Sequence, residues 1–467
     1  MPENRRILEW ISLKDAPNGV IPNSDEIFAV LQEIQKLQEC TGVARGRPQE
    51  LRNIEWLIIE WRGSRDREEF YLDPATISSL EKFSVLPRWH IDGKDPVEYP
   101  SAALKAQTPA MWKEGTSSVM DSKPLSKDSM QSTWRTAPRS EWNISHYLLD
   151  ALNAHPIDLN KEIPVHGKDE KVPYMPQWYL QRWVLFYSAL PLLLHETYMA
   201  LTGRTIGPIT AFNFYFFAFN AIVIYQVHIL RRLGHKYGFL DGDKHARDGV
   251  PDVGVAKVVA SLYKTTGSRL ILSIILSYNK TQRPSQMSWI WLPLEIGLYG
   301  IVLDFWFYWY HRLMHDVSYL WKYHRTHHLT KHPNPLLAAY ADHEQEFFDM
   351  VGVPMMTYFS LKLVGLPMGF YEWWICHEYV AFAEVFGHSG LRMHSGVPST
   401  LGWLLQMFNA EIVIEDHDLH HRKGWRKSYN YGKQTRLWDR IFGTCMERIE
   451  SAEGNVDYEN TAKMPLF

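Results

Sequence analysis

Histidine is the residue type in this chain with the clearest potential for chemistry. Thirteen of the 21 histidines lie between His311 and His421, and eight of them form three short clusters. The clusters read His-Arg-Leu-Met-His at 311–315, His-Arg-Thr-His-His at 324–328 and His-Asp-Leu-His-His at 417–421. Neutral imidazole is the commonest metal ligand among side chains, and residues three or four apart on a helix lie on one face. Each cluster therefore directs two or three imidazoles the same way.

The three clusters hold more imidazoles than one metal ion can bind. Tetrahedral and octahedral sites take about four to six ligands, whereas two neighbouring ions can use them all. The sequence therefore predicts a dinuclear, histidine-rich metal site. Its expected ligands from the clusters are His311, His315, His324, His327, His328, His417, His420 and His421.

Structural zinc is the alternative use for such clusters. The three cysteines are scattered and form no paired motif, although structural zinc sites usually contain cysteine. The zinc-protease pattern His-Glu-x-x-His is also missing, because His343-Glu344 and His377-Glu378 lack the second histidine. Nor does the chain contain the two Glu-x-x-His helices typical of soluble di-iron bundles. A non-redox membrane protein that binds structural zinc or carries lipid stays open as the second hypothesis.

Further motifs surround the clusters in a definite order. Leu-Trp at 320–321 separates the first two clusters, and Gly-His-Ser-Gly at 387–390 precedes the third. Leu-Trp-Asp-Arg-Ile-Phe-Gly-Thr at 437–444 follows it. Over about residues 304–444, this arrangement resembles the fatty acid hydroxylase/sterol desaturase superfamily of membrane di-iron oxygenases.

The resemblance implies one further ligand, His388, from the His-Ser-Gly element. Where the family usually has His-Pro-x-Glu, this chain has His-Glu-Gln-Glu at 343–346, which departs from the family pattern. The resemblance does not fix a tenth ligand, for which His377 and His394 are candidates.

The resemblance also implies a reaction class. It implies two iron ions, O2, and electrons from NAD(P)H that arrive through a reductase and a b-type cytochrome. The implied reaction is hydroxylation, oxidation or desaturation at C–H bonds of a lipophilic small molecule, either sterol-like, fatty acyl or another lipid. The implied partners are therefore that substrate, membrane lipid, and the electron-donor cytochrome with its reductase. The protein itself supplies binding, orientation and exclusion of competing reactions.

Charged residues beside the clusters have two possible roles. A carboxylate there can accept the free imidazole N–H of a ligand, or it can be a solvated surface charge. Arg325 and Arg422 lie next to predicted ligands and are expected at the surface. The candidate carboxylate acceptors are Asp316, Asp342, Glu415, Asp416 and Asp418.

Apolar segments before the clusters predict the elements that position them. Thr205–Leu230 contains no Asp, Glu, Lys or Arg in 26 residues, and about 20 residues suffice to span a bilayer. Trp183–Leu201 is expected to pair with it as a hairpin. A second, less regular hairpin is predicted from Arg269–Tyr278 and Trp289–Tyr310. The predicted fold is therefore all-α: an integral membrane helical bundle of about four transmembrane helices, with a histidine-rich helical cap and a mostly helical or irregular N-terminal extension.

Charge asymmetry predicts the orientation. If the basic end of the first hairpin at Arg231-Arg232 is cytoplasmic, the second hairpin returns the chain so that His311 begins on the same side. The protein is thus expected to be multi-pass, in the endoplasmic reticulum, with its metal site facing the cytosol. The expected parts are a cytosolic extension of unreadable role (1–170), the transmembrane helices (171–310), the di-iron domain (311–450) and a tail (451–467).

The composition and the N-terminal third add few constraints. A net charge of −3 without a basic run gives no reason to expect nucleic-acid binding. The first 30 residues lack a long apolar core, so a cleaved signal peptide is not expected. Start signals and amphipathic patterns predict helices over Ser24–Glu39 and Pro48–Arg62, and polar residues predict a loop over Gly93–Ser145.

Overall fold

The structure is a computed structural model that describes residues 7–14, 40–46, 54–61, 84–90, 126–242 and 246–467. The chain divides into two compact units, Met1–Met120 and Asp121–Phe467. The first contains a small sheet, and the second is helical and carries all the histidines of the clusters.

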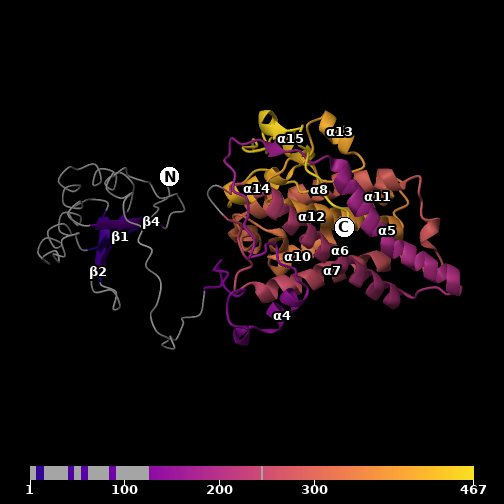
Figure 1. The fold of residues 1–467 in the computed structure, drawn as a ribbon, viewed down its shortest axis with the longest axis horizontal. Helices are drawn as coiled ribbons and strands as arrows, with labels where there is room; N and C mark the ends of the chain where they lie inside the picture. Colours follow the sequence, from indigo (N-terminus) through magenta and orange to yellow (C-terminus); the bar gives the residue numbers. More distant parts are fainter. Residues whose placement is uncertain (1–6, 15–39, 47–53, 62–83, 91–125, 243–245) are drawn as a thin grey trace, which may run out of the picture. The chain divides into compact units, whose positions relative to one another are not determined.

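The N-terminal unit contains a four-stranded antiparallel sheet (Figure 1), whose strands pair in the order β2-β3-β1-β4. In the central pair, Ile11 lies opposite Leu57. The helix predicted over Pro48–Arg62 is therefore wrong, because the strand-favouring sequence Ile-Glu-Trp-Leu-Ile-Ile-Glu-Trp pairs on both edges. The helix predicted over Ser24–Glu39 lies outside the described residues. The strands are β1 (Ile7–Lys14), β2 (Cys40–Gly46), β3 (Ile54–Trp61) and β4 (Ser84–His90).

The second unit is built from long helices joined by short ones. Its only sheet among the described residues is the two-residue parallel pair of β5 (Val172–Pro173) and β6 (Val456–Asp457), which joins the C-terminal tail to the segment before the first long helix. The helices are α4 (Ile144–Ala151), α5 (Gln177–Thr202), α6 (Pro208–Tyr237), α7 (Val255–Ser277), α8 (Leu292–Asp316), α9 (Ser318–His324), α10 (His343–Phe347), the π-helix η6 (Phe348–Gly352), α11 (Val353–Leu363), α12 (Phe370–Gly387), α13 (Gly402–Met407), α14 (Ile414–Lys423) and α15 (Leu437–Ile441), with 3₁₀ turns that include η4 (His327–Leu329) and η5 (Pro335–Ala339).

Helix α12 is the central element of this unit. All of its residues except Glu384 are buried, so every face of this helix packs inside the unit. It contacts α5, α6, α7, α8 and α14, which therefore surround it (Figure 1). Because α12 ends at Gly387, this rigid core helix delivers His388 to a defined place.

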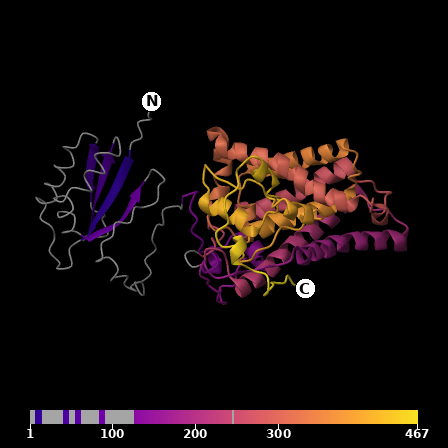
Figure 2. The same cartoon turned by 90° about the horizontal axis from the view of Figure 1, so that it is seen from above.

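Helices α5 and α6 form the predicted first hairpin. Among the described residues, these two helices are long and apolar enough to cross a membrane. They turn at Gly203, whose positive φ of 65° suits glycine. Leu193, Leu201, Ile209 and Phe217 on this hairpin are exposed, as expected for a surface that faces lipid. Figure 2 shows the magenta hairpin extending to one end of the unit, beyond the yellow C-terminal segments.

The predicted second hairpin corresponds to α7 and α8. Both are long helices, of 23 and 25 residues, but neither contains a stretch as apolar as those in α5 and α6, and neither is a candidate membrane span. Arg269 in α7 and Glu295 and Asp304 in α8 interrupt their apolar character. The described chain thus contains two candidate spans, where about four were predicted.

Candidate metal centre

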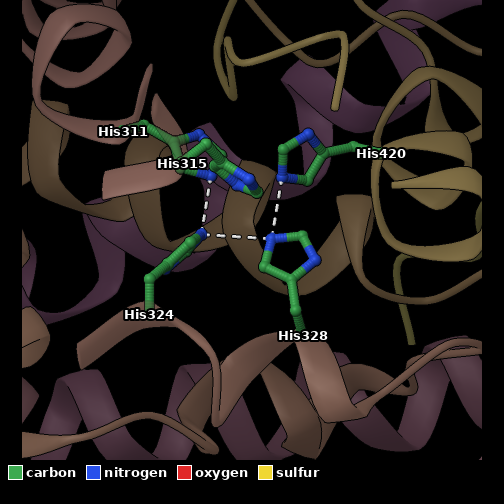
Figure 3. Close-up of side chains that lie close together, drawn as sticks. All are labelled: His311, His315, His324, His328 and His420. Carbon is green, nitrogen blue, oxygen red and sulfur yellow. Dashed lines mark hydrogen bonds between the residues drawn. The ribbon is translucent and has the colours of Figure 1, made fainter. Parts of the chain in front are cut away.

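All nine predicted ligand side chains converge in the helical unit, in two groups. In each group, one ring nitrogen from every histidine lies within 4.8 Å of the others, and every residue is buried. The five-histidine group, shown in Figure 3, consists of His311, His315, His324, His328 and His420. The four-histidine group consists of His327, His388, His417 and His421.

The local backbone decides which histidine joins which group. His311 and His315 lie one turn apart on α8 and stay together. The second cluster divides instead, because the α-helix ends at His324 and the chain continues as the 3₁₀ turn η4. His327 therefore joins the four-histidine group, whereas His328 joins the five-histidine group. The two groups are adjacent, since the rings of His328 and His421 lie 4.8 Å apart.

Most of these rings are held by their Nδ1 atoms. A backbone carbonyl can only accept a hydrogen bond, so an Nδ1 that faces one carries the proton. Nε2 of the same ring is then left with its lone pair, as a metal ligand requires. The Nδ1–H groups donate to the carbonyl oxygens of Tyr431 (from His311, 2.7 Å), Trp425 (His315, 2.8 Å), Tyr340 (His327, 3.3 Å), Glu384 (His388, 2.8 Å), Tyr429 (His420, 2.6 Å) and Thr330 (His421, 3.0 Å), and His324 Nδ1 lies 3.0 Å from Gln345 Oε1.

The facing Nε2 atoms fit a bound cation. Nε2 of His327 lies 3.2 Å from Nε2 of His388, and both rings already carry their proton on Nδ1. Burial lowers the pKa of His327 to about 3 and also lowers the pKa of His388, so neither ring gains a second proton at neutral pH. Two lone pairs at this distance repel each other unless they share a cation. Two ligand nitrogens that each lie roughly 2.1 Å from one ion, with a right angle between the two bonds, are roughly 3 Å apart. The separation of the two Nε2 atoms is therefore the one expected for two ligands of one ion.

A narrow cavity, with room for about a water molecule, adjoins both groups. Its wall includes His311 and His324 from one group and His327 and His417 from the other. The remaining wall combines apolar and polar side chains. These side chains include Phe307, Ala338, Ala341 and Met350, together with Gln345, Glu346, Asp349, Glu384 and Lys433.

Comparison with known proteins decides the family. Residues 296–444 match the family model described as fatty acid hydroxylase. The chain is 44% identical to the fatty acid hydroxylase vlmA of Lecanicillium sp over 309 residues. The aligned stretch covers 63% of this chain and 84% of the relative. The chain belongs to the fatty acid hydroxylase/sterol desaturase superfamily. The resemblance predicted from the motifs is thereby confirmed.

More distant relatives match mainly around the clusters. Alkylglycerol monooxygenase of Xenopus tropicalis is 26% identical over 206 residues, which is 43% of this chain and 39% of the relative. Methylsterol monooxygenase 2-2 of Arabidopsis thaliana is 30% identical over 181 residues, which is 37% of this chain and 61% of the relative. No solved structure matches the chain significantly. These relatives are named as hydroxylases and monooxygenases, so this superfamily member is an oxidoreductase that acts on C–H bonds.

The five carboxylates predicted as acceptors have other partners, and that prediction is wrong. Within the described residues, none of them accepts a hydrogen bond from the nine imidazoles. Asp416 pairs with Arg448 at 2.7 Å, and Asp418 pairs with Arg422 at 2.9 Å. Arg422 was expected at the surface, but its side chain is buried among these carboxylates. Asp418 also pairs with Arg247, Glu415 accepts backbone N–H groups of 449–451, Asp342 pairs with Lys257, and Asp316 pairs with Arg312.

The family's closing signature acts on the site through the backbone. Asp439 accepts hydrogen bonds from the backbone N–H groups of Tyr431 and Gly432, both at 2.8 Å, and from the hydroxyl of Thr444 at 2.6 Å. The carbonyl of the same Tyr431 anchors His311. Asp304 similarly accepts the backbone N–H groups of 433–435. Both carboxylates therefore position the 431–435 loop that orients His311.

Asp439→Asn is expected to weaken metal binding without unfolding the protein. The amide presents an NH2 group to at least one of the donors that the carboxylate accepts, so the Tyr431 carbonyl shifts away from His311. Loss of such a supporting contact typically costs about 10–100-fold in metal affinity. Titration of the metal-free protein with Co²⁺ measures this change. Asp169→Asn, at an exposed site, is the control, and an unchanged affinity in Asp439→Asn would refute the role.

The candidates for a tenth ligand lie elsewhere. His377 Nδ1 is 3.4 Å from the hydroxyl of Ser273, and His394 Nε2 is 4.0 Å from a carboxylate oxygen of Glu411. Neither belongs to a metal-binding group in the described part of the chain. Sequence reasoning missed Gln345, whose side-chain oxygen lies 3.0 Å from Nδ1 of His324. Its position in the His-Glu-Gln-Glu segment at 343–346, where the family usually has His-Pro-x-Glu, could have pointed to a role near the site.

Proposed function

We propose that this chain is a membrane-bound di-iron oxygenase that hydroxylates, oxidises or desaturates a lipophilic substrate with O2 and electrons from NAD(P)H, delivered through a b-type cytochrome chain. The observation that carries the proposal is the pair of facing, neutral Nε2 atoms of His327 and His388. One iron ion would be held by the five-histidine group and one by the four-histidine group. The residues that we assign as ligands are His311, His315, His324, His327, His328, His388, His417, His420 and His421.

The bound iron ions would supply O2 activation and the oxidant for an unactivated C–H bond. The protein contributes neutral ligands, a water-poor setting and a place for the substrate. Burial keeps the imidazoles uncharged, and their Nδ1 anchors keep Nε2 directed at the metals. In the cavity wall, burial would raise the pKa of Glu384, but the ammonium group of Lys433, 2.7 Å away, holds it at about 2. This ion pair neutralises two of the charged side chains in the wall.

A lipid substrate follows from the membrane setting. The relatives are named for fatty acid, alkylglycerol and methylsterol oxidation, which supports a lipid without choosing among these classes. We propose that α7 and α8 complete a four-span bundle, because Ile271 and Ile275 on α7 and Trp289 and Ile290 before α8 are exposed and apolar. With the basic end of α6 on the cytosolic side, the metal centre lies at the cytosolic face, consistent with the endoplasmic reticulum.

Metal analysis combined with lipid profiling tests the proposal. The full chain, expressed in cells with ample iron, is expected to contain about two iron atoms per chain and to consume O2 when supplied with reductant. Lipids of the host are expected to gain an oxidised product only when the chain is present. Redox-silent zinc in both groups under these conditions would overturn the proposal in favour of a structural metal site. Zinc acquired under iron shortage is no test, because zinc outcompetes ferrous iron at nitrogen ligands.

A bulky residue in the cavity is expected to block the substrate but not the metals. Ala341 is 4% exposed and lines the cavity, so Ala341→Trp fills space beside His327. Turnover is expected to fall by roughly a hundredfold, as for misplaced substrates in general, while the iron content stays unchanged. Ala341→Val is the milder variant, since an oversized side chain costs about 1–3 kcal/mol. Ala200→Trp, exposed on α5, is the control, and a fully active Ala341→Trp enzyme would exclude this cavity as the substrate site.

A further inference from the structure

Two tryptophans connect the five-histidine group with the protein surface. The ring of Trp321 lies 5.2 Å from that of His315 and 5.6 Å from that of His328. The ring of Trp425 lies 5.1 Å from that of Trp321, edge to face. Trp321 is 9% exposed, whereas Trp425 is 38% exposed. Aromatic rings thus form a continuous series of contacts from solvent to the predicted metal ligands.

The backbone of Trp425 also belongs to this connection. Its carbonyl accepts the Nδ1–H of His315 at 2.8 Å. The outer tryptophan is therefore joined to a predicted ligand twice, by a hydrogen bond and through the ring of Trp321. A side-chain variant of Trp425 keeps the hydrogen bond and removes only the ring.

Cations surround the outer tryptophan. The ammonium of Lys331 lies 4.7 Å from the ring of Trp425, and the guanidinium of Arg325 lies 5.9 Å from it. Arg426, one residue further, donates a hydrogen bond to Ser318 at the start of α9, which holds the two segments together. The segments 318–331 and 423–429 contain no Asp or Glu, in a chain whose net charge is −3. Arg325 pairs with Asp128 at 2.8 Å, and Lys331 donates to the carbonyl of Gly424 at 2.6 Å. We call the exposed cations of the two segments the basic face: Lys322, Lys423, Arg426 and Lys427.

The basic face and the substrate cavity approach the site from different directions. The cavity wall includes His311 and His324 but not His315 or His328, the two histidines whose rings lie nearest Trp321. A protein docked over Trp425 would therefore leave the cavity free. This separation matters because an oxygenase must receive electrons while its substrate is bound.

We propose that Trp425 and Trp321 form the route by which electrons enter the metal site, and that the basic face docks an acidic one-electron donor protein. This inference rests on the proposed oxygenase function. Hydroxylation is balanced as RH + O2 + 2 e⁻ + 2 H⁺ → ROH + H2O, so two donor molecules are each oxidised by one electron per turnover. Charge complementarity favours an acidic donor, because opposite potentials steer association and raise its rate.

Charge reversal tests the docking surface. The full chain in nanodiscs of zwitterionic lipid is mixed with the reduced soluble domain of an acidic b-type cytochrome, and cytochrome oxidation is followed by stopped flow. The double variant Arg426→Glu with Lys427→Glu is expected to slow association by roughly tenfold and to reduce its salt dependence. Arg139→Glu, whose side chain is 70% exposed elsewhere, is the matched control. Wild-type association in the double variant, or a change seen only with anionic nanodisc lipid, would overturn the docking assignment.

Removal of the outer ring tests the route. Trp425→Leu is expected to bind the cytochrome with unchanged affinity but to accept its electrons roughly tenfold more slowly at saturation, while Trp425→Phe retains an intermediate rate. Iron content and reduction by dithionite should match the wild type in both variants. An unchanged saturating rate in Trp425→Leu would overturn the route. A wild-type protein that binds no iron and consumes no O2 even with dithionite would instead overturn the proposed function.

Discussion

His328→Ala is expected to abolish turnover and to empty the five-histidine group while the protein stays in the membrane. The side chain of His328 is completely buried, and its Nε2 lies 3.1 Å from Nε2 of both His324 and His420. Its ring also contacts His421 in the other group. Because loss of a mere supporting contact costs about 10–100-fold in metal affinity, loss of a ligand shared by these neighbours should cost more than a hundredfold. Iron content, O2 consumption and membrane fractionation measure the outcome.

A histidine outside the groups supplies the control for this variant. The side chain of His343 is 62% exposed and lies between Lys264 and Glu346, so His343→Ala should retain iron and turnover. His421→Ala tests the four-histidine group in the same way and should also be inactive. Wild-type turnover in His328→Ala or His421→Ala would contradict the assignment of that residue as a ligand.

Helical spacing pointed to the eight cluster histidines, which the structure brings together with His388, but it did not show how they divide between the two groups. His311 and His315 follow a regular α-helix, so the i, i+4 rule places both in the same group. His327 goes to the other group because the chain leaves the α-helix after His324. That change of helix type depends on packing around the loop, and residue types in a single sequence carry little information about it.

The partners of the imidazoles could not be predicted from residue types. Six of the nine Nδ1 atoms face backbone carbonyls, and every residue has a carbonyl. The carboxylates that were predicted instead failed for a geometric reason. Asp416 and Asp418 flank His417 on α14, and consecutive helical residues point about 100° apart. Their side chains therefore face Arg448 and Arg422, not the metal groups.

Composition predicted the most apolar hairpin but not the N-terminal sheet. Thr205–Leu230 has no Asp, Glu, Lys or Arg, and from Pro208 onward it lies in α6, one of the two candidate spans. The apolar residues of Ile54–Trp61 fit a helix or a strand, and pairing with β1 and β2 decides for the strand. The β-branched and aromatic residues of this segment suit a strand, but only its long-range partners decide between the two structures.

Acid is expected to destabilise the metal-free protein steeply below about pH 6.5. Burial lowers the pKa of His327 to about 3, and it also lowers the pKa of the six other histidines of the two groups that lie outside α8. Between pH 6.5 and pH 3 the unfolded chain therefore binds protons that the folded chain refuses. The stability contributed by these neutral rings is complete above pH 6.5 and is lost as the pH falls.

The size of this effect follows from the number of rings. One fully depressed imidazole costs about 1.4 kcal/mol of unfolding free energy per pH unit, and several such rings titrate together here, so the loss of stability should be steep. The thermal unfolding midpoint of the metal-free protein in detergent should fall continuously as the pH is lowered from about 7.5 to about 5. In His421→Ala the midpoint should fall less steeply with pH, because unfolding takes up about one proton fewer. Bound metal should shift the transition to lower pH, because protons must displace the ion first. A midpoint independent of pH would mean that the rings are already protonated or solvated, and the facing lone pairs on which the metal assignment rests would not exist.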